Sequence, residues 1–151
     1  MRQNNRESVL TERVEHCRWC LLLRWLAFVI WSGAILFFGL KPQVAVPDVQ
    51  HADKILHAGA FALQALFLGR ALLLHFAPGP ALAAGSLFSI LFGIVLEVAQ
   101  ATLTTSRTGD LFDVLANSSG VLLVWLLMLA YYKRAASTGK SQARHNKGQG
   151  W

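Results

Sequence analysis

The chain has little charge and almost no cysteine. Only 15% of its 151 residues are charged and 54% are apolar, whereas a soluble domain carries about a quarter charged residues. Its two cysteines, Cys17 and Cys20, have no second pair that would complete a zinc site. The composition therefore leaves no room for a soluble catalytic domain and indicates a membrane protein.

Proline is also scarce, and its placement divides the chain. All four prolines fall in two short segments, 41–54 and 77–80. Because proline and glycine interrupt helices, these segments and the polar segment 104–110 are predicted loops. They separate four apolar runs, each long enough to cross a bilayer as a helix. The four runs are 21–40, 55–76, 81–103 and 111–132.

We therefore predict an all-α fold, a four-helix transmembrane bundle that occupies residues 21–132. Residues 1–20 form an N-terminal tail, and residues 133–151 form a basic tail that we expect to be disordered, because it is polar and rich in Gly, Ser, Lys and Gln. The first run is longer than the roughly 7–15 apolar residues of a signal peptide, and no Ala-x-Ala motif follows it, so we expect it to be retained.

Basic residues are unevenly placed around the predicted spans. Eleven of the fourteen Lys and Arg residues lie in the two tails, near the start of the first run (Arg24) or near the end of the second run (Arg70). The other three are Lys41, Lys54 and Arg107. Since basic residues collect on the cytoplasmic side, both termini are predicted to be cytoplasmic. Anionic lipid is a sufficient partner for the basic tails, and their separation argues against nucleic acid binding.

The third run carries a stripe of small residues that ends in an acid. Small residues allow a neighbouring helix to come close, so this face is predicted to point into the bundle. A carboxylate at membrane depth is costly and indicates a functional site. The five residues of the stripe, spaced four apart on one helix face, are Ala81, Gly85, Ser89, Gly93 and Glu97.

Polar residues gather where the second run begins, the third ends and the fourth begins. Up-and-down topology brings these three ends to the same side of the membrane, and within each run the polar residues share a helix face. We predict that His57, Glu97, Arg107 and Asp113 meet in one cluster there. The other polar residues predicted at this level are Asp53, Lys54, Gln100, Asp110 and Asn117.

As a set, these residues resemble the VanZ-like family of bacterial integral membrane proteins, over about residues 50–125. The resemblance implies a small multi-span protein of the bacterial inner membrane, and the family takes its name from a member linked to low-level teicoplanin resistance. The chain departs from the pattern in having Thr108-Gly109 after Arg107, and in an unusually long cytoplasmic tail. The matching motifs are Asp53-Lys54-x-x-His57-x-x-x-Phe61, Glu97-x-x-Gln100, Arg107 with Asp110 and Asp113, and Asn117-x-x-Gly120.

The first functional hypothesis is a site for an envelope lipid or a lipid-linked anionic precursor on the outer leaflet. Histidine titrates near neutral pH, so His57 is the candidate acid or base, with Glu97 and Asp113 assisting. Lys54 and Arg107 are candidates to hold a phosphate. Further candidate substrate-binding residues are Asp53, Gln100, Asp110 and Asn117. No cofactor is predicted, and a metal is disfavoured because no His-Glu-x-x-His spacing occurs, although His and carboxylates are acceptable ligands.

Two other classes remain open at this point. The polar residues could lock the fold of a structural or interaction subunit, in which Gln64 and Ser89 are predicted to make hydrogen bonds between helices. A proton-coupled transporter is less favoured, because the acids cluster on one side and no inverted repeat is visible.

Overall fold

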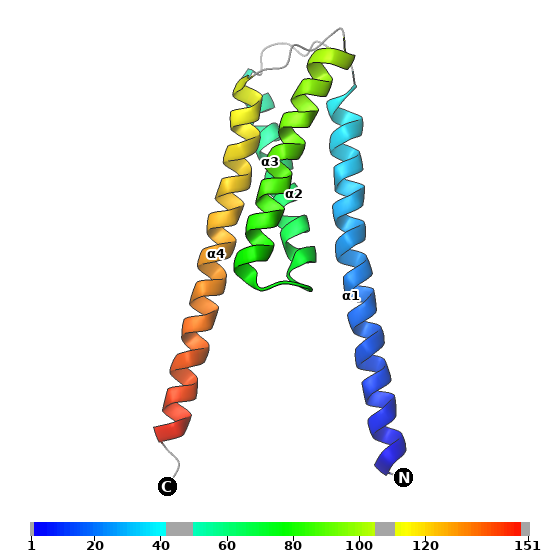
Figure 1. Ribbon diagram of the computed structural model, residues 1–151, viewed down its shortest axis with the longest axis vertical. Helices are drawn as coiled ribbons and strands as arrows, with labels where there is room; N and C mark the ends of the chain where they lie inside the picture. The colour runs from blue at the N-terminus through cyan, green and yellow to red at the C-terminus, as the bar shows by residue number, and fades with distance from the viewer. Residues whose placement is uncertain (1, 42–49, 105–110, 149–151) are drawn as a thin grey trace.

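The computed structural model describes residues 2–41, 50–104 and 111–148, and within them the side chains of 18–41, 53–104 and 111–138. These residues form four helices and no strand, which confirms the predicted all-α class. The helices are α1 (Arg2–Gly39), α2 (Gln50–Leu72), α3 (Pro78–Leu103) and α4 (Leu111–Gly148) (Figure 1).

Each helix contains a segment that is long and apolar enough to cross a membrane, as in a multi-pass membrane protein. The ends of these segments agree with those of the predicted runs to within four residues, except that the last extends six residues farther. Pro78 starts α3 at a first-turn position where its missing N–H is harmless. The four segments are Arg18–Gly39, Asp53–Leu72, Pro78–Leu103 and Leu111–Thr138.

Three helices form the packed core, and the first lies against its side. α2 packs on both α3 and α4, α3 packs on α4, and α1 packs mainly on α2. Within the described part of the chain, α1 does not touch α4. In Figure 1 these two long helices flank the shorter α2–α3 hairpin, and α1 begins at the same end of the molecule at which α4 stops.

Small residues bring the core helices close together. The whole predicted stripe of α3, from Ala81 to Glu97, is buried, which confirms its inward direction. A Cβ added to Gly85 would lie 3.1 Å from the backbone nitrogen of Gly69 in α2. A Cβ added to Gly120 of α4 would overlap the carbonyl oxygen of Ala58. The two glycines therefore set how closely α3 and α4 approach α2.

Polar side chains hold α1 on the core. Trp31 Nε1 donates a hydrogen bond to the Ala60 carbonyl at 2.9 Å, and Gln64 Nε2 donates to Ser32 Oγ at 2.9 Å. The prediction for Gln64 is thus confirmed. The prediction for Ser89 is wrong, because its hydroxyl donates to the Gly85 carbonyl one turn earlier in α3. A serine can satisfy its hydroxyl on its own helix, which a longer glutamine side chain does less readily.

The C-terminal segment differs from the expected disordered tail. α4 continues beyond the apolar segment as far as Gly148. The added residues include Ala, Lys, Arg and Gln, which favour helix despite the intervening Ser, Thr and Gly. Since the membrane-spanning part already supplies the costly helix nucleus, each further residue only has to extend it.

Candidate functional site

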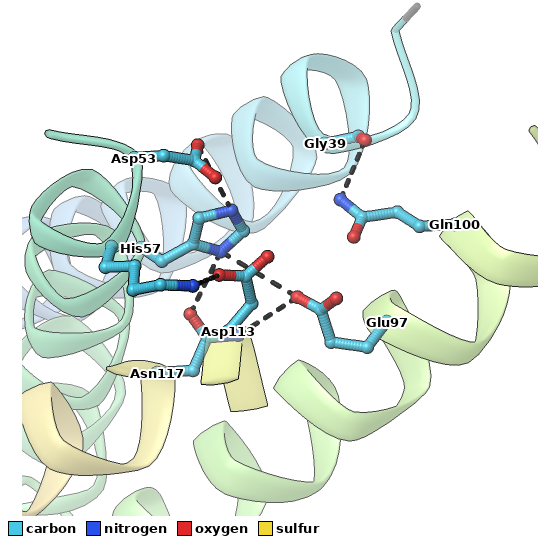
Figure 2. Close-up of polar contacts among 8 residues, drawn as sticks. Gly39, Asp53, His57, Glu97, Gln100, Asp113 and Asn117 are labelled. Carbon is cyan, nitrogen blue, oxygen red and sulfur yellow. Dashed lines mark hydrogen bonds and ion pairs between the residues drawn. The ribbon is translucent and has the colours of Figure 1, made fainter. Parts of the chain in front are cut away.

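The candidate site lies at the end of the bundle where α1 and α3 end and α2 and α4 begin. Six side chains from three helices come together there, as Figure 2 shows for most of them. Two of its acids, Asp53 and Asp113, lie in the first turns of α2 and α4, where a negative charge suits the helix dipole. We call the following six residues the polar cluster: Asp53, Lys54, His57, Glu97, Asp113 and Asn117.

His57 is the centre of the polar cluster. Its Nδ1 lies 3.2 Å from Asn117 Oδ1 and 3.8 Å from Glu97 Oε1. Its other ring nitrogen, Nε2, lies 3.7 Å from Asp53 Oδ1, one turn earlier in α2. The imidazole therefore stands between two carboxylates, one on each side of the ring (Figure 2).

Glu97 and Asn117 form the buried floor of the cluster. They are 5% and 1% exposed, and Asn117 Nδ2 donates to Glu97 Oε1 at 3.4 Å. A Cβ added to Gly93 would lie 3.1 Å from Phe61 and 3.4 Å from Asn117. The small stripe of α3 thus leaves room for the side chains of α2 and α4, and the amide and imidazole stabilise a carboxylate that would be costly alone.

Lys54 and Asp113 form the more open edge of the cluster. Lys54 Nζ lies 3.2 Å from Asp113 Oδ1, and the two side chains are 42% and 14% exposed. The ammonium also lies 5.3 Å from the centre of the Phe112 ring, within cation–π range. The open edge of the cluster therefore carries a positive charge that is paired with Asp113 and partly exposed.

The structure brings most of the predicted site residues together, but not all of them. Gln100 is buried, yet its Nε2 donates to the Gly39 carbonyl at the end of α1, 2.9 Å away and apart from the polar cluster (Figure 2). In the structure it fastens α1 to α3. Arg107 and Asp110 lie outside the described residues. The catalytic and binding roles of the six clustered residues remain predictions.

An apolar cavity, open to the surroundings, adjoins the polar cluster, and no pattern in the sequence predicted it. Its volume is about 200 Å³, and Asp53 and His57 line its polar edge. Apolar residues that face a cavity look the same in a sequence as those that face lipid, so no pattern could have distinguished them. The apolar lining comes from three helices: Ile35, Phe38 and Gly39 of α1, Leu56, Ala60 and Phe61 of α2, and Leu96 of α3.

Chemically, the arrangement offers a proton-transfer group and a cation beside an apolar cavity. A histidine between carboxylates can act as a general acid or base. Ligand atoms of Asp53, His57 and Asp113 all lie within 4.8 Å of one another. Among the described residues, these three could therefore hold a metal ion.

Compared with known proteins, the chain matches no family model, no curated protein and no solved structure.

Proposed function

We propose that this is a small VanZ-like protein of the bacterial inner membrane that binds, and through His57 acts on, an anionic lipid or lipid-linked precursor of the cell envelope. One observation carries the proposal: His57 and Asp53 belong to the polar cluster and also line the apolar cavity. A ligand at this place meets charge at one end and hydrocarbon at the other, which is the chemistry of a lipid.

The cavity supports lipid entry from the side. Two of its lining residues, Phe38 and Leu56, are 66% and 69% exposed. Both lie in the end turns of segments that can span a membrane, so we place their exposed faces where the headgroups of the lipids meet the hydrocarbon. The cavity therefore opens toward lipid, and an apolar chain can enter it without crossing water.

The polar half of the site suits a headgroup. Lys54 supplies a positive charge at the exposed edge, and a phosphate or other anion binds there by charge-assisted hydrogen bonds. His57 then stands beside the headgroup as acid or base, with Glu97 and Asp53 on either side of its ring. Glu97 is too deeply buried to be a surface ligand, so its role is to orient and polarise the imidazole.

The test of the proposed function is lipid binding to matched variants. Ala60→Phe fills the cavity, Lys54→Gln removes the charge, and Ala83→Phe places the same ring on an exposed position of α3 as the control. Native mass spectrometry would compare phosphatidylglycerol and undecaprenyl phosphate with phosphatidylcholine. Each site variant should weaken binding of the anionic lipids by about ten-fold, and the control should not. Equal binding by all four proteins would contradict the proposal.

The orientation that accompanies this proposal has its own test. The distribution of basic residues favours cytoplasmic termini, which puts the polar cluster on the outer side of the membrane. Reporter fusions after residues 40 and 103 should then read as extracytoplasmic, and one after residue 76 as cytoplasmic. Reversed signals would move the site to the cytoplasmic leaflet.

A structural role is the second candidate, and the burial of Asn117 and Glu97 favours it. Their hydrogen bond lies between α3 and α4, near the close crossing of Gly120 and Ala58. Such a network could serve only to lock the bundle. A transporter has less support, because all three acidic side chains that the structure describes belong to the polar cluster at one end.

A further inference from the structure

We infer that Asp53, His57 and Asp113 bind a divalent transition-metal ion of the Zn²⁺ or Mn²⁺ type. This inference does not rest on the proposed lipid-binding function; in the metal-bound state His57 is a ligand and does not act as the acid or base. It rests on the spacing of the three side chains and on the hydrogen bonds that orient the His57 ring.

The three side chains lie close enough together to become ligands of one ion. Their nearest ligand atoms all lie within 4.8 Å of one another. An ion with bonds of about 2.0–2.2 Å holds its ligand atoms at most about 4.4 Å apart, so a small side-chain rotation closes the site. Asp53 and His57 are one turn apart on α2, and Asp113 comes from the first turn of α4. Two rigid helices therefore fix all three ligands.

Hydrogen bonds determine which nitrogen of His57 carries a proton. Asn117 donates a hydrogen bond from its Nδ2 to Glu97 Oε1, 3.4 Å away. Asn117 then turns its Oδ1 toward His57 Nδ1, 3.2 Å away. That oxygen accepts a hydrogen bond, so Nδ1 is the donor. A metal-binding histidine typically uses its second N–H in this way, to hold the ring in place for the metal.

The other ring nitrogen then has a lone pair directed at a carboxylate. His57 Nε2 and Asp53 Oδ1 lie 3.7 Å apart, longer than the roughly 2.7–3.2 Å of an N–H···O hydrogen bond. Two such acceptors can be bridged by a proton on Nε2, by a water molecule or by a metal ion. The distance suits two ligands of one ion better than a hydrogen bond.

The Lys54 ammonium competes with a metal ion for Asp113, so a variant of Lys54 gives a further test of the inference. Its ammonium lies 3.2 Å from Asp113 Oδ1, but its side chain is 42% exposed and can swing outward. Removal of this charge should therefore strengthen metal binding.

The ligand types indicate which metal binds. One imidazole and two carboxylates favour a transition metal over Mg²⁺ or Ca²⁺, which prefer oxygen ligands alone.

The test uses the full chain in detergent, stripped of metal and titrated calorimetrically with Zn²⁺, Mn²⁺ or Mg²⁺. All proteins carry Cys17→Ser and Cys20→Ser to remove thiol binding. We expect one Zn²⁺ or Mn²⁺ per chain and much weaker Mg²⁺ binding. His57→Ala and Asp113→Asn should each lower the affinity by about ten-fold or more. His75→Ala, on an exposed histidine of the α2–α3 turn, is the matched control and should change nothing.

Lys54→Met decides the matter even if a ligand variant unfolds. It should raise Mn²⁺ affinity by about three-fold or more, and misfolding cannot produce a gain. No uptake by the parent, or uptake that His57→Ala and Asp113→Asn leave unchanged, would overturn the inference. So would nitrogen-15 spectra that show His57 protonated on both ring nitrogens in the presence of saturating Zn²⁺.

Discussion

Helices α1 and α3 are both long and apolar, yet they join the bundle by different means. The membrane-spanning window of α3 is 39% buried in the protein, whereas that of α1 is 6% buried. α3 presents its small-residue stripe to α2 and α4. α1 adds Ile35 to the buried core and is held by hydrogen bonds that Trp31 Nε1 donates and that Ser32 Oγ and the Gly39 carbonyl accept. In a bilayer, apolarity alone does not drive helices together, so fine packing or polar contacts must do so.

The difference has a consequence for the proposed site. The polar cluster is built entirely from α2, α3 and α4, which pack closely. The adjoining cavity instead has α1 as one wall. The polar cluster is thus held by the closely packed part of the molecule, and the apolar wall is held by the part with fewer contacts. This division suits a site that must keep its geometry while admitting a lipid chain.

The largest expected effect comes from breaking the close approach of α2 and α4. Gly120→Ala should lower the free energy of unfolding by about 3 kcal/mol, because the added Cβ overlaps the Ala58 carbonyl oxygen. Gly33→Ala in α1 is the matched control, since nothing lies within 4 Å of its added Cβ. Thermal melting in detergent would compare the two. A harmless Gly120→Ala would show that the core helices are no more tightly packed than α1.

Core packing should also distinguish one valine from another. Val121 is 0% exposed and Val29 is 58% exposed. Val121→Ala leaves a cavity and should lower the free energy of unfolding by about 2 kcal/mol. Val29→Ala in α1 removes the same atoms from a lipid-facing position and should leave stability almost unchanged. Equal melting temperatures for the two variants would contradict the assignment of α1 to the periphery.

The contact that Gln100 makes with α1 should have a smaller effect. Gln100→Ala removes the hydrogen bond to the Gly39 carbonyl and should cost about 0.6–1 kcal/mol, typical of polar contacts between membrane helices. Hydrogen exchange should rise at the end of α1 while α4 stays protected. Thr102→Ala is the control, because Thr102 bonds only within its own helix. If exchange rose equally in α1 and α4, α1 would not be a separable element.

The smallest expected change in stability belongs to Glu97→Gln. This variant keeps the shape of the side chain, so a working site should lose activity while melting hardly changes. If the cluster only locks the fold, the broken pair should instead cost about 3–5 kcal/mol. The paired measurements are melting temperature in detergent and an envelope-stress or glycopeptide-sensitivity assay. Full activity of Glu97→Gln would remove Glu97 from the proposed chemistry.

The sequence alone determined the four helices, the inward face of α3 and the gathering of polar residues at one end. These features are local, because run length, proline placement and a spacing of four residues are properties of one helix. His57, Glu97 and Asp113 could be assigned to one level in this way. Their common depth follows because successive spans cross the membrane in opposite directions, which brings these three helix ends to one side.

Only the tertiary structure decided which partners these residues meet. Gln100 shares a helix face with Glu97, but it reaches the end of α1 instead of His57. Ser89 bonds to its own helix. His57 meets Asn117 with one ring nitrogen and Asp53 with the other, and the cavity lies beside them. These features depend on how neighbouring helices are rotated and on how closely their glycines let them approach. Rotation and approach are set by contacts between helices, which the spacing of residues along one helix does not contain.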